Sequence, residues 1–174
     1  MKKIICAIFV FVFGLTNAQE QTKKGKFIIE ANAGSLATGN TSLYFSKVDF
    51  ITQLNIGLDG GYFLIDNLAI KAGVGYGLTD LKSNSNDDMS NIVYKIGAQY
   101  YIINKIPVGI DFTGRHSLNT ASSTSSNWIG VEAGYAIFLG PNVAITPKLR
   151  NNFTLDESKS YSSFQGLVGF VLFF

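Results

Sequence analysis

Apolar and polar residues alternate in eight stretches that follow one another along the chain. Alternation with a period of two is typical of β-strands, because successive side chains point to opposite faces of a sheet. Turn-forming residues separate the stretches. The pattern predicts an all-β protein with strands at about 26–36, 49–64, 68–80, 91–103, 107–118, 127–139, 143–154 and 161–174.

The connections between these strands alternate between short and long. Three are tight turns, at Ile65–Asn67, Asn104–Ile106 and Gly140–Asn142. The others are longer and rich in Ser, Thr, Asn and Asp, at about 37–48, 81–90, 119–126 and 155–160. Short turns at one end and long loops at the other are typical of an up-and-down, eight-stranded antiparallel transmembrane β-barrel. We expect both termini to lie at the short-turn end, in the periplasm.

Alternation alone does not tell which face of the barrel meets lipid. A soluble, lipocalin-like ligand binder would enclose the apolar face, whereas a membrane barrel would turn it outward. Glycines favour the membrane barrel, because eight strands leave a narrow interior and an exposed strand gains nothing from glycine. They share the polar face at positions 57, 73, 75, 77, 97, 109, 130, 134 and 169.

Two residues in the expected strands carry expectations of their own. Pro147 falls inside the expected strand 143–154 and has no N–H to donate. We therefore expect either a bulge at Thr146–Pro147 or a strand that begins later. Trp128 begins the expected strand 127–139, and we expect it to anchor the barrel at the outer membrane interface, with stacking on a ligand as the alternative.

Residues 1–18 read as a cleaved signal peptide, with Lys2 and Lys3 before the apolar run Ile4–Leu15. Residues 19–174 then form one domain without cysteine, since Cys6 lies in the leader. The chain has 14 basic and 12 acidic residues, and loss of Lys2 and Lys3 leaves 12 of each. A nucleic-acid partner would need a clustered basic face, so none is expected.

Charged residues on the polar face form the candidate site. Inside a narrow barrel they must pair, because an unpaired buried charge is very costly. We expect a lumen plugged by salt bridges, and the alternative is a gated ion path along the same charges. The residues are Glu30, Asp59, Lys71, Lys95, Asp111, Arg115, Glu132, Lys148 and Arg150.

The mature chain resembles the small eight-stranded outer-membrane barrels of the OmpA/OmpX type. The resemblance rests on Asn17–Gln19, the glycine-rich strand Ala72–Gly77 and the terminal run Gly169–Phe174. It implies a cell outer membrane location, contact with outer-membrane lipid and lipopolysaccharide, and a monomer. It also implies that Phe174 is part of the signal read by the barrel-assembly machinery. Some relatives carry a peptidoglycan-binding domain after the barrel; this sequence ends with the expected last strand, so we do not expect tethering to the cell wall.

Some barrels of this kind are lipid A deacylases, with a histidine and a serine two residues apart on the lipid-facing side. Here Leu118 stands two residues after His116, the only histidine, so we expect no enzyme. Asp87–Asp88 and Asp156–Glu157 are too few carboxylates for a calcium site. No metal and no other cofactor is expected.

These observations predict a non-enzymatic structural or surface-interaction protein whose four long loops contact the outside. A low-conductance, porin-like channel for ions or small solutes is the alternative. A lipid-modifying enzyme and a soluble ligand binder are the remote ones.

Overall fold

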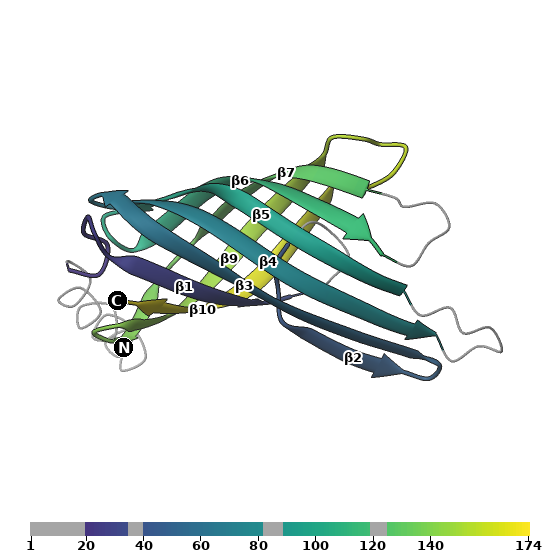
Figure 1. Cartoon of the computed structure of the whole chain (residues 1–174). Helices are drawn as coiled ribbons and strands as arrows, with labels where there is room; N and C mark the ends of the chain where they lie inside the picture. The colour runs from purple at the N-terminus through teal and green to yellow at the C-terminus, as the bar shows by residue number, and fades with distance from the viewer. Residues whose placement is uncertain (1–19, 35–39, 82–88, 119–124) are drawn as a thin grey trace, which may run out of the picture.

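Antiparallel strands of the chain form one sheet that closes into a barrel (Figure 1). The structure is a computed structural model, and it describes residues 20–34, 40–81, 89–118 and 125–174. Within these residues it contains ten strands: β1 (Phe27–Ala33), β2 (Tyr44–Val48), β3 (Ile51–Ile65), β4 (Leu68–Leu81), β5 (Met89–Ile102), β6 (Ile106–Ser117), β7 (Ser125–Gly134), β8 (Ile137–Gly140), β9 (Val143–Thr154) and β10 (Ser163–Phe173).

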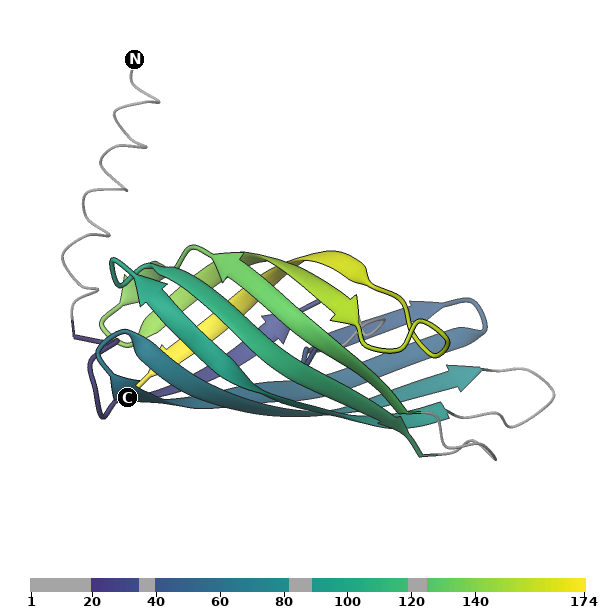
Figure 2. The same cartoon turned by 90° about the horizontal axis from the view of Figure 1, so that it is seen from above.

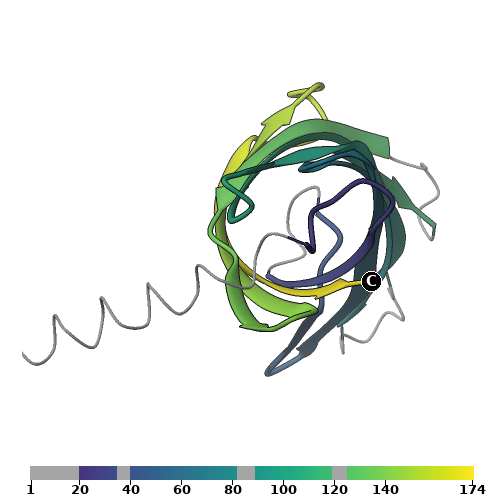
Figure 3. The same cartoon turned by 90° about the vertical axis from the view of Figure 1, so that its left-hand side faces the viewer.

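The barrel closes through β1, which pairs with β10 on one side and with β3 on the other. β1 and β2 occupy the same position around the barrel, because both pair with the same edge of β3. β1 pairs with Asp59–Tyr62, and β2 pairs with Ile51–Asn55. β8 continues the place of β7 along β9 in the same way. Ten strands therefore occupy eight positions around the barrel (Figure 3), which confirms the predicted eight-stranded fold. The strands run obliquely to the barrel axis (Figure 2).

Most strand ends lie within about three residues of the sequence-based prediction, and two differences are larger. The segment 37–48, expected as a loop, contains β2, and its residues 35–39 lie outside the described part of the chain. The expected strand 127–139 is interrupted at Tyr135–Ala136, between β7 and β8. The interruption arises because the Ala136 N–H leaves the sheet ladder and donates to the Lys105 carbonyl at 2.7 Å.

Pro147 lies inside β9, which begins at Val143 as predicted. Its carbonyl accepts from the Tyr135 N–H at 3.1 Å. The nitrogen and carbonyl of one strand residue point to the same side, so the nitrogen of Pro147 faces the break between β7 and β8. The missing donor thus falls where the neighbouring strand is interrupted. Neither of the two alternatives expected for Pro147, a bulge or a later start, is what the structure shows.

The outer wall of the barrel is apolar. Outward side chains such as Val74, Ile96 and Leu149 are 64%, 59% and 59% exposed, which confirms the predicted assignment of faces. On β4 the apolar outward residues run from Leu68 to Leu78, and Asp80 follows. Ten steps of about 3.3 Å, inclined by about 40°, give a band about 25 Å tall, the height typical of a membrane barrel.

The inward face is crowded where charged side chains cross it. A Cβ added at Gly130 would lie 2.0 Å from Arg150 Nη2, and one at Gly97 would lie 2.4 Å from Asp111 Cβ. These glycines leave room for long side chains in a narrow lumen. No helix in the described residues is long and apolar enough to cross a membrane.

A lysine at the middle of the outer band should prevent stable insertion. We expect Val74→Lys to lower the folding free energy in lipid vesicles by about 2–4 kcal/mol, because the ammonium would face hydrocarbon. Thr52→Lys, at the polar loop-side edge of the same wall, should cost no more than about 1 kcal/mol. Urea titration of folding into vesicles measures both. Equal costs for the two variants would contradict a lipid-facing band.

Candidate functional site in the lumen

Side chains of the inward face form three layers along the barrel axis, and the layer nearest the short turns is apolar. Its aromatic rings contact one another, with centroids 5.8 Å apart for Phe63 and Tyr101 and 6.1 Å apart for Tyr101 and Phe173. The buried members are Ile28, Phe63, Ala69, Tyr101, Ala136, Ala144, Val171 and Phe173. This layer fills the turn end of the lumen with packed apolar side chains.

The segment before β1 covers this layer. Thr22 Oγ1 donates to Asn67 Oδ1 at 2.6 Å, and the Asn67 N–H donates to the Thr22 carbonyl at 2.7 Å. The Gln21 side chain donates to the Pro141 carbonyl. Figure 3, which faces the turn end, shows the purple segment within the outline of the barrel. The turn end is therefore closed by two features, the aromatic rings of the apolar layer and the segment before β1.

The middle layer is a charge network of four acids and four bases, contributed by seven strands. Each member makes at least one ion pair with another member. All are buried, with exposed fractions of 8% or less. They are Glu30, Asp59, Asp111 and Glu132 with Lys71, Lys95, Lys148 and Arg150. The network is formally neutral.

Arg150 holds one half of the charge network. Its guanidinium binds Asp111 through two bonds, Nη1 to Oδ2 at 2.6 Å and Nη2 to Oδ1 at 2.7 Å. Nη1 also reaches Glu132 Oε2 at 3.2 Å, and Nε donates to Asn152 Oδ1 at 2.8 Å. Bidentate pairs between arginine and a carboxylate are strong and geometrically specific ion pairs. They fix Arg150 although it is fully buried.

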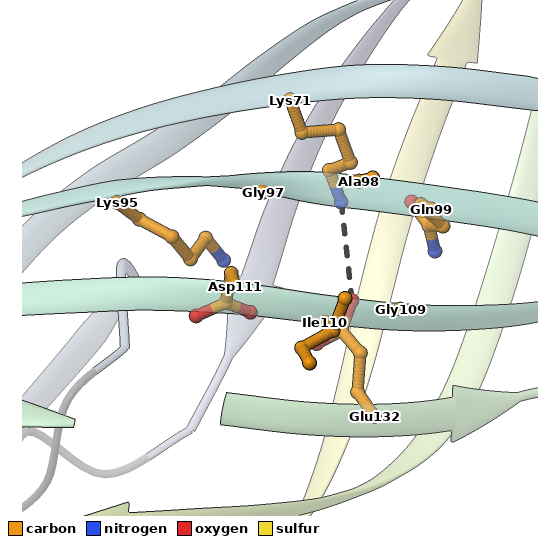
Figure 4. Close-up of a pocket in the computed structure, with 9 residues that line it drawn as sticks. All are labelled: Lys71, Lys95, Gly97, Ala98, Gln99, Gly109, Ile110, Asp111 and Glu132. Atoms are coloured by element: carbon orange, nitrogen blue, oxygen red, sulfur yellow. Dashed lines mark ion pairs between the residues drawn. The ribbon is translucent and has the colours of Figure 1, made fainter. Parts of the chain in front are cut away.

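Lysines hold the other half. Lys71 Nζ lies 2.5 Å from Glu30, 3.8 Å from Asp59 and 4.0 Å from Glu132. Lys148 pairs with Glu30 and lies 3.3 Å from Glu132, and Lys95 pairs with Asp59. Figure 4 shows the side chains of Lys71, Lys95, Asp111 and Glu132 directed into one interior space, a cavity of about 10 Å³. That is about the volume one water molecule needs, far from an open path.

Arg115, the ninth residue of the predicted network, lies apart from it. It is half-buried on the loop side of the lumen. No acid forms an ion pair with it among the described residues. The eight paired charges balance without it.

The loop-side layer is a feature that the sequence did not predict. Asn40, Thr41 and Ser42 fold into the lumen and are 2%, 1% and 0% exposed. They belong to the expected external loop 37–48, so that prediction is wrong for these residues. A short polar segment looks the same in sequence whether it lies in water or in a polar lumen, so no signal distinguished the two. Most of the predicted loops 81–90 and 119–126 lies outside the described residues.

Trp128 is not an interface anchor. It is 2% exposed inside the barrel, and its Nε1 donates to the Tyr161 carbonyl at 3.1 Å. Phe174 pairs its main chain with Phe27 at 3.1 and 3.0 Å. Its side chain is 55% exposed at the turn end. A role of Phe174 in assembly stays a prediction.

His116 has a partner that the sequence did not suggest. Its Nδ1 lies 2.9 Å from Ser125 Oγ, on the neighbouring strand β7. Both side chains are exposed at the loop side of the outer face. No carboxylate contacts His116 within the described part of the chain, so a Ser–His–acid triad is not assembled there. The same residues contain no cluster of three or more potential metal ligands.

No family model and no curated protein matches the sequence. Solved structures match the fold. The outer membrane protein Ail of Yersinia pestis, in a phospholipid nanodisc, is 10% identical with a TM-score of 0.55, and the match covers 87% of this chain and 100% of that one. OprG of Pseudomonas aeruginosa is 14% identical with a TM-score of 0.52, and the match covers 87% and 97%. The chain therefore has the fold of small outer-membrane barrels.

Removal of Arg150 should destabilise the barrel far more than removal of Arg115. We expect Arg150→Gln to cost about 3–5 kcal/mol, because it leaves the buried Asp111 carboxylate unpaired. Arg115→Gln, the matched control without an acid partner in the described residues, should cost about 1 kcal/mol or less. Urea unfolding in vesicles measures both. Similar costs would contradict the assigned role of Arg150, and Arg150→Gln/Asp111→Asn should recover part of the loss.

Asp156, in the loop between β9 and β10, should titrate unusually low. Ser158 donates to Asp156 Oδ1 through its hydroxyl at 2.6 Å and its N–H at 3.1 Å, and Lys159 lies 2.9 Å away. The Ser158 hydroxyl bond is the largest cause that lowers the pKa of Asp156 from 3.8 to about 2. The turn is thus fully stabilised above pH 4 and loses this contribution as pH falls toward 2. Carboxyl NMR should show this midpoint, and Ser158→Ala should raise it; a wild-type midpoint near 4 would contradict the contact.

Proposed function

We propose that the chain is an integral outer-membrane protein with a non-enzymatic structural or surface-interaction role and a lumen closed by the charge network. The apolar outer band supports the membrane location. Residues 1–18 would direct secretion through the inner membrane and then be removed. Outer-membrane lipid and lipopolysaccharide would surround a monomer, and the barrel-assembly machinery would recognise its last strand.

The observation that carries this proposal is the neutral, fully paired charge network. The eight buried charges satisfy one another, so none of them is available as a nucleophile, a general base or a ligand for a passing ion. The apolar layer and the Gln21–Thr22 segment close the turn end beneath them. What the barrel offers to other molecules is therefore its loop side.

The loop side carries large exposed residues. β3, β4 and β5 are 15, 14 and 14 residues long, whereas β7 has 10 and β10 has 11. The wall around β2–β4 consequently reaches farther to the loop side (Figure 1). Phe45 and Phe50 are 69% and 72% exposed on this wall, and Tyr161 is 84% exposed in the connection between β9 and β10. Exposed aromatic residues on a rigid scaffold are suited to binding other molecules.

A low-conductance channel is the second candidate, and the contacts of Lys71 favour it. Its ammonium lies within 4.0 Å of three carboxylates, from Glu30, Asp59 and Glu132. An ammonium with three nearby acceptors can exchange partners, which could open a path past the middle layer. Such a path would also require the apolar layer at the turn end to move.

Loop replacement tests the surface role. The variant has an Asn-Gly turn in place of residues 155–162. We expect it still to fold, as shown by a change in gel mobility between the unheated and the boiled sample. Cells that carry it should lose attachment to surfaces or to one another relative to cells with the wild-type chain. Arg115→Gln, which changes the lumen and leaves the loops intact, is the control. Wild-type attachment by the loop-replaced cells would contradict the proposed role of this loop.

A further inference from the structure

The inner segment, Asn40–Ser42, lies on a shelf of glycines from β3 and β4. A Cβ added at Gly57 would lie 2.9 Å from the Ser42 nitrogen and 3.2 Å from the Thr41 carbonyl carbon. One added at Gly75 would lie 3.9 Å from Thr41 Cα, an ordinary contact. The main chain of Thr41 and Ser42 therefore packs directly on the main chain of β3 and β4 at these glycines.

Polar bonds to other described residues hold the inner segment in the lumen. Thr41 Oγ1 donates to Asp59, and Lys95 Nζ donates to Asn40 Oδ1 at 3.3 Å. Asn55 Nδ2 donates to the Ser42 carbonyl at 2.9 Å. The segment itself contributes no apolar side chain. Water can replace each of these bonds, so the net contribution of each to stability is only about 0.5–3 kcal/mol.

Burial of the segment also leaves polar atoms unsatisfied. Asn40 Nδ2, in the segment, and Oδ1 of Asn55, which contacts it, are buried and have no hydrogen-bond partner among the described residues. Each such atom costs free energy in the closed arrangement and would regain a partner in water. The unsatisfied atoms thus oppose the closed arrangement that the bonds favour.

We propose that Asn40–Ser42 is a displaceable plug. The Leu43 N–H donates to the Asn32 carbonyl at 2.6 Å and anchors the end of the segment, so Asn40–Ser42 can swing away about this point. Displacement opens the loop-side half of the lumen as a water-filled vestibule with Asp59 and Lys95 at its floor. The rest of the charge network and the apolar layer remain closed below. The barrel thus has two arrangements of its outer mouth.

Cysteine labelling tests the plug, because the sole cysteine of the chain, Cys6, lies in the predicted leader. Ser42→Cys and Thr146→Cys place thiols at sites that are 0% and 1% exposed, on the loop side and the turn side of the charge network. Each folded variant in vesicles is treated with a membrane-impermeant maleimide. We expect Ser42→Cys to react at least about tenfold faster, because local opening exposes it without unfolding. Equal rates would overturn the proposal.

A second comparison tests the shelf. Gly57→Ala, added to Ser42→Cys, pushes a methyl group into the plug and should raise the labelling rate at least about tenfold. Gly75→Ala makes only an ordinary contact, and Gly60→Ala meets nothing within 4 Å, so neither should change the rate. If Gly57→Ala labels no faster than Gly60→Ala, the shelf does not hold the plug. Labelling reports displacement whether or not the barrel conducts or binds at its surface.

Discussion

The cost of removing charge from water governs the interior of this barrel. Eight ionised side chains lie in a lumen from which water is nearly excluded, and each would be very unfavourable alone. Because four are acidic and four are basic, every one can be paired. The two-bonded contact between Arg150 and Asp111 and the lysine contacts to Glu30 and Asp59 meet this requirement. A middle layer with one sign in excess could not be fully paired in this way.

Other features follow from the space that the charges need. Glycine at positions 97 and 130 leaves room for Asp111 and Arg150, and the apolar layer around Tyr101 keeps water from the turn end. Because the polar groups are turned inward, the apolar residues form the outer wall. The same arrangement that closes the lumen thus produces a surface that suits a bilayer and leaves the loop side to meet other molecules.

The sequence predicted the features that depend on alternation. The faces of β4 and β5, the inward position of the charges and the number of strands all follow from a period of two. It could not predict where Asn40–Ser42 lie, because polar residues suit a polar lumen as well as water. Trp128 was misplaced for a related reason: an aromatic residue at a strand end suits the interface or the interior. The pairing of Ser125 with His116 depends on the register between β6 and β7, which the alternation within each strand does not specify.

The most direct test of a closed, neutral lumen is the ionic current through the folded protein in a planar lipid bilayer. Folding is verified on the same sample by the change in gel mobility on boiling. A large porin, added under the same conditions, verifies that the bilayer accepts barrels and that the recording detects their current. The paired network predicts no current steps above background at moderate voltage. Discrete, reproducible steps from the folded wild-type protein would contradict the account and make the charged lumen a conduction path.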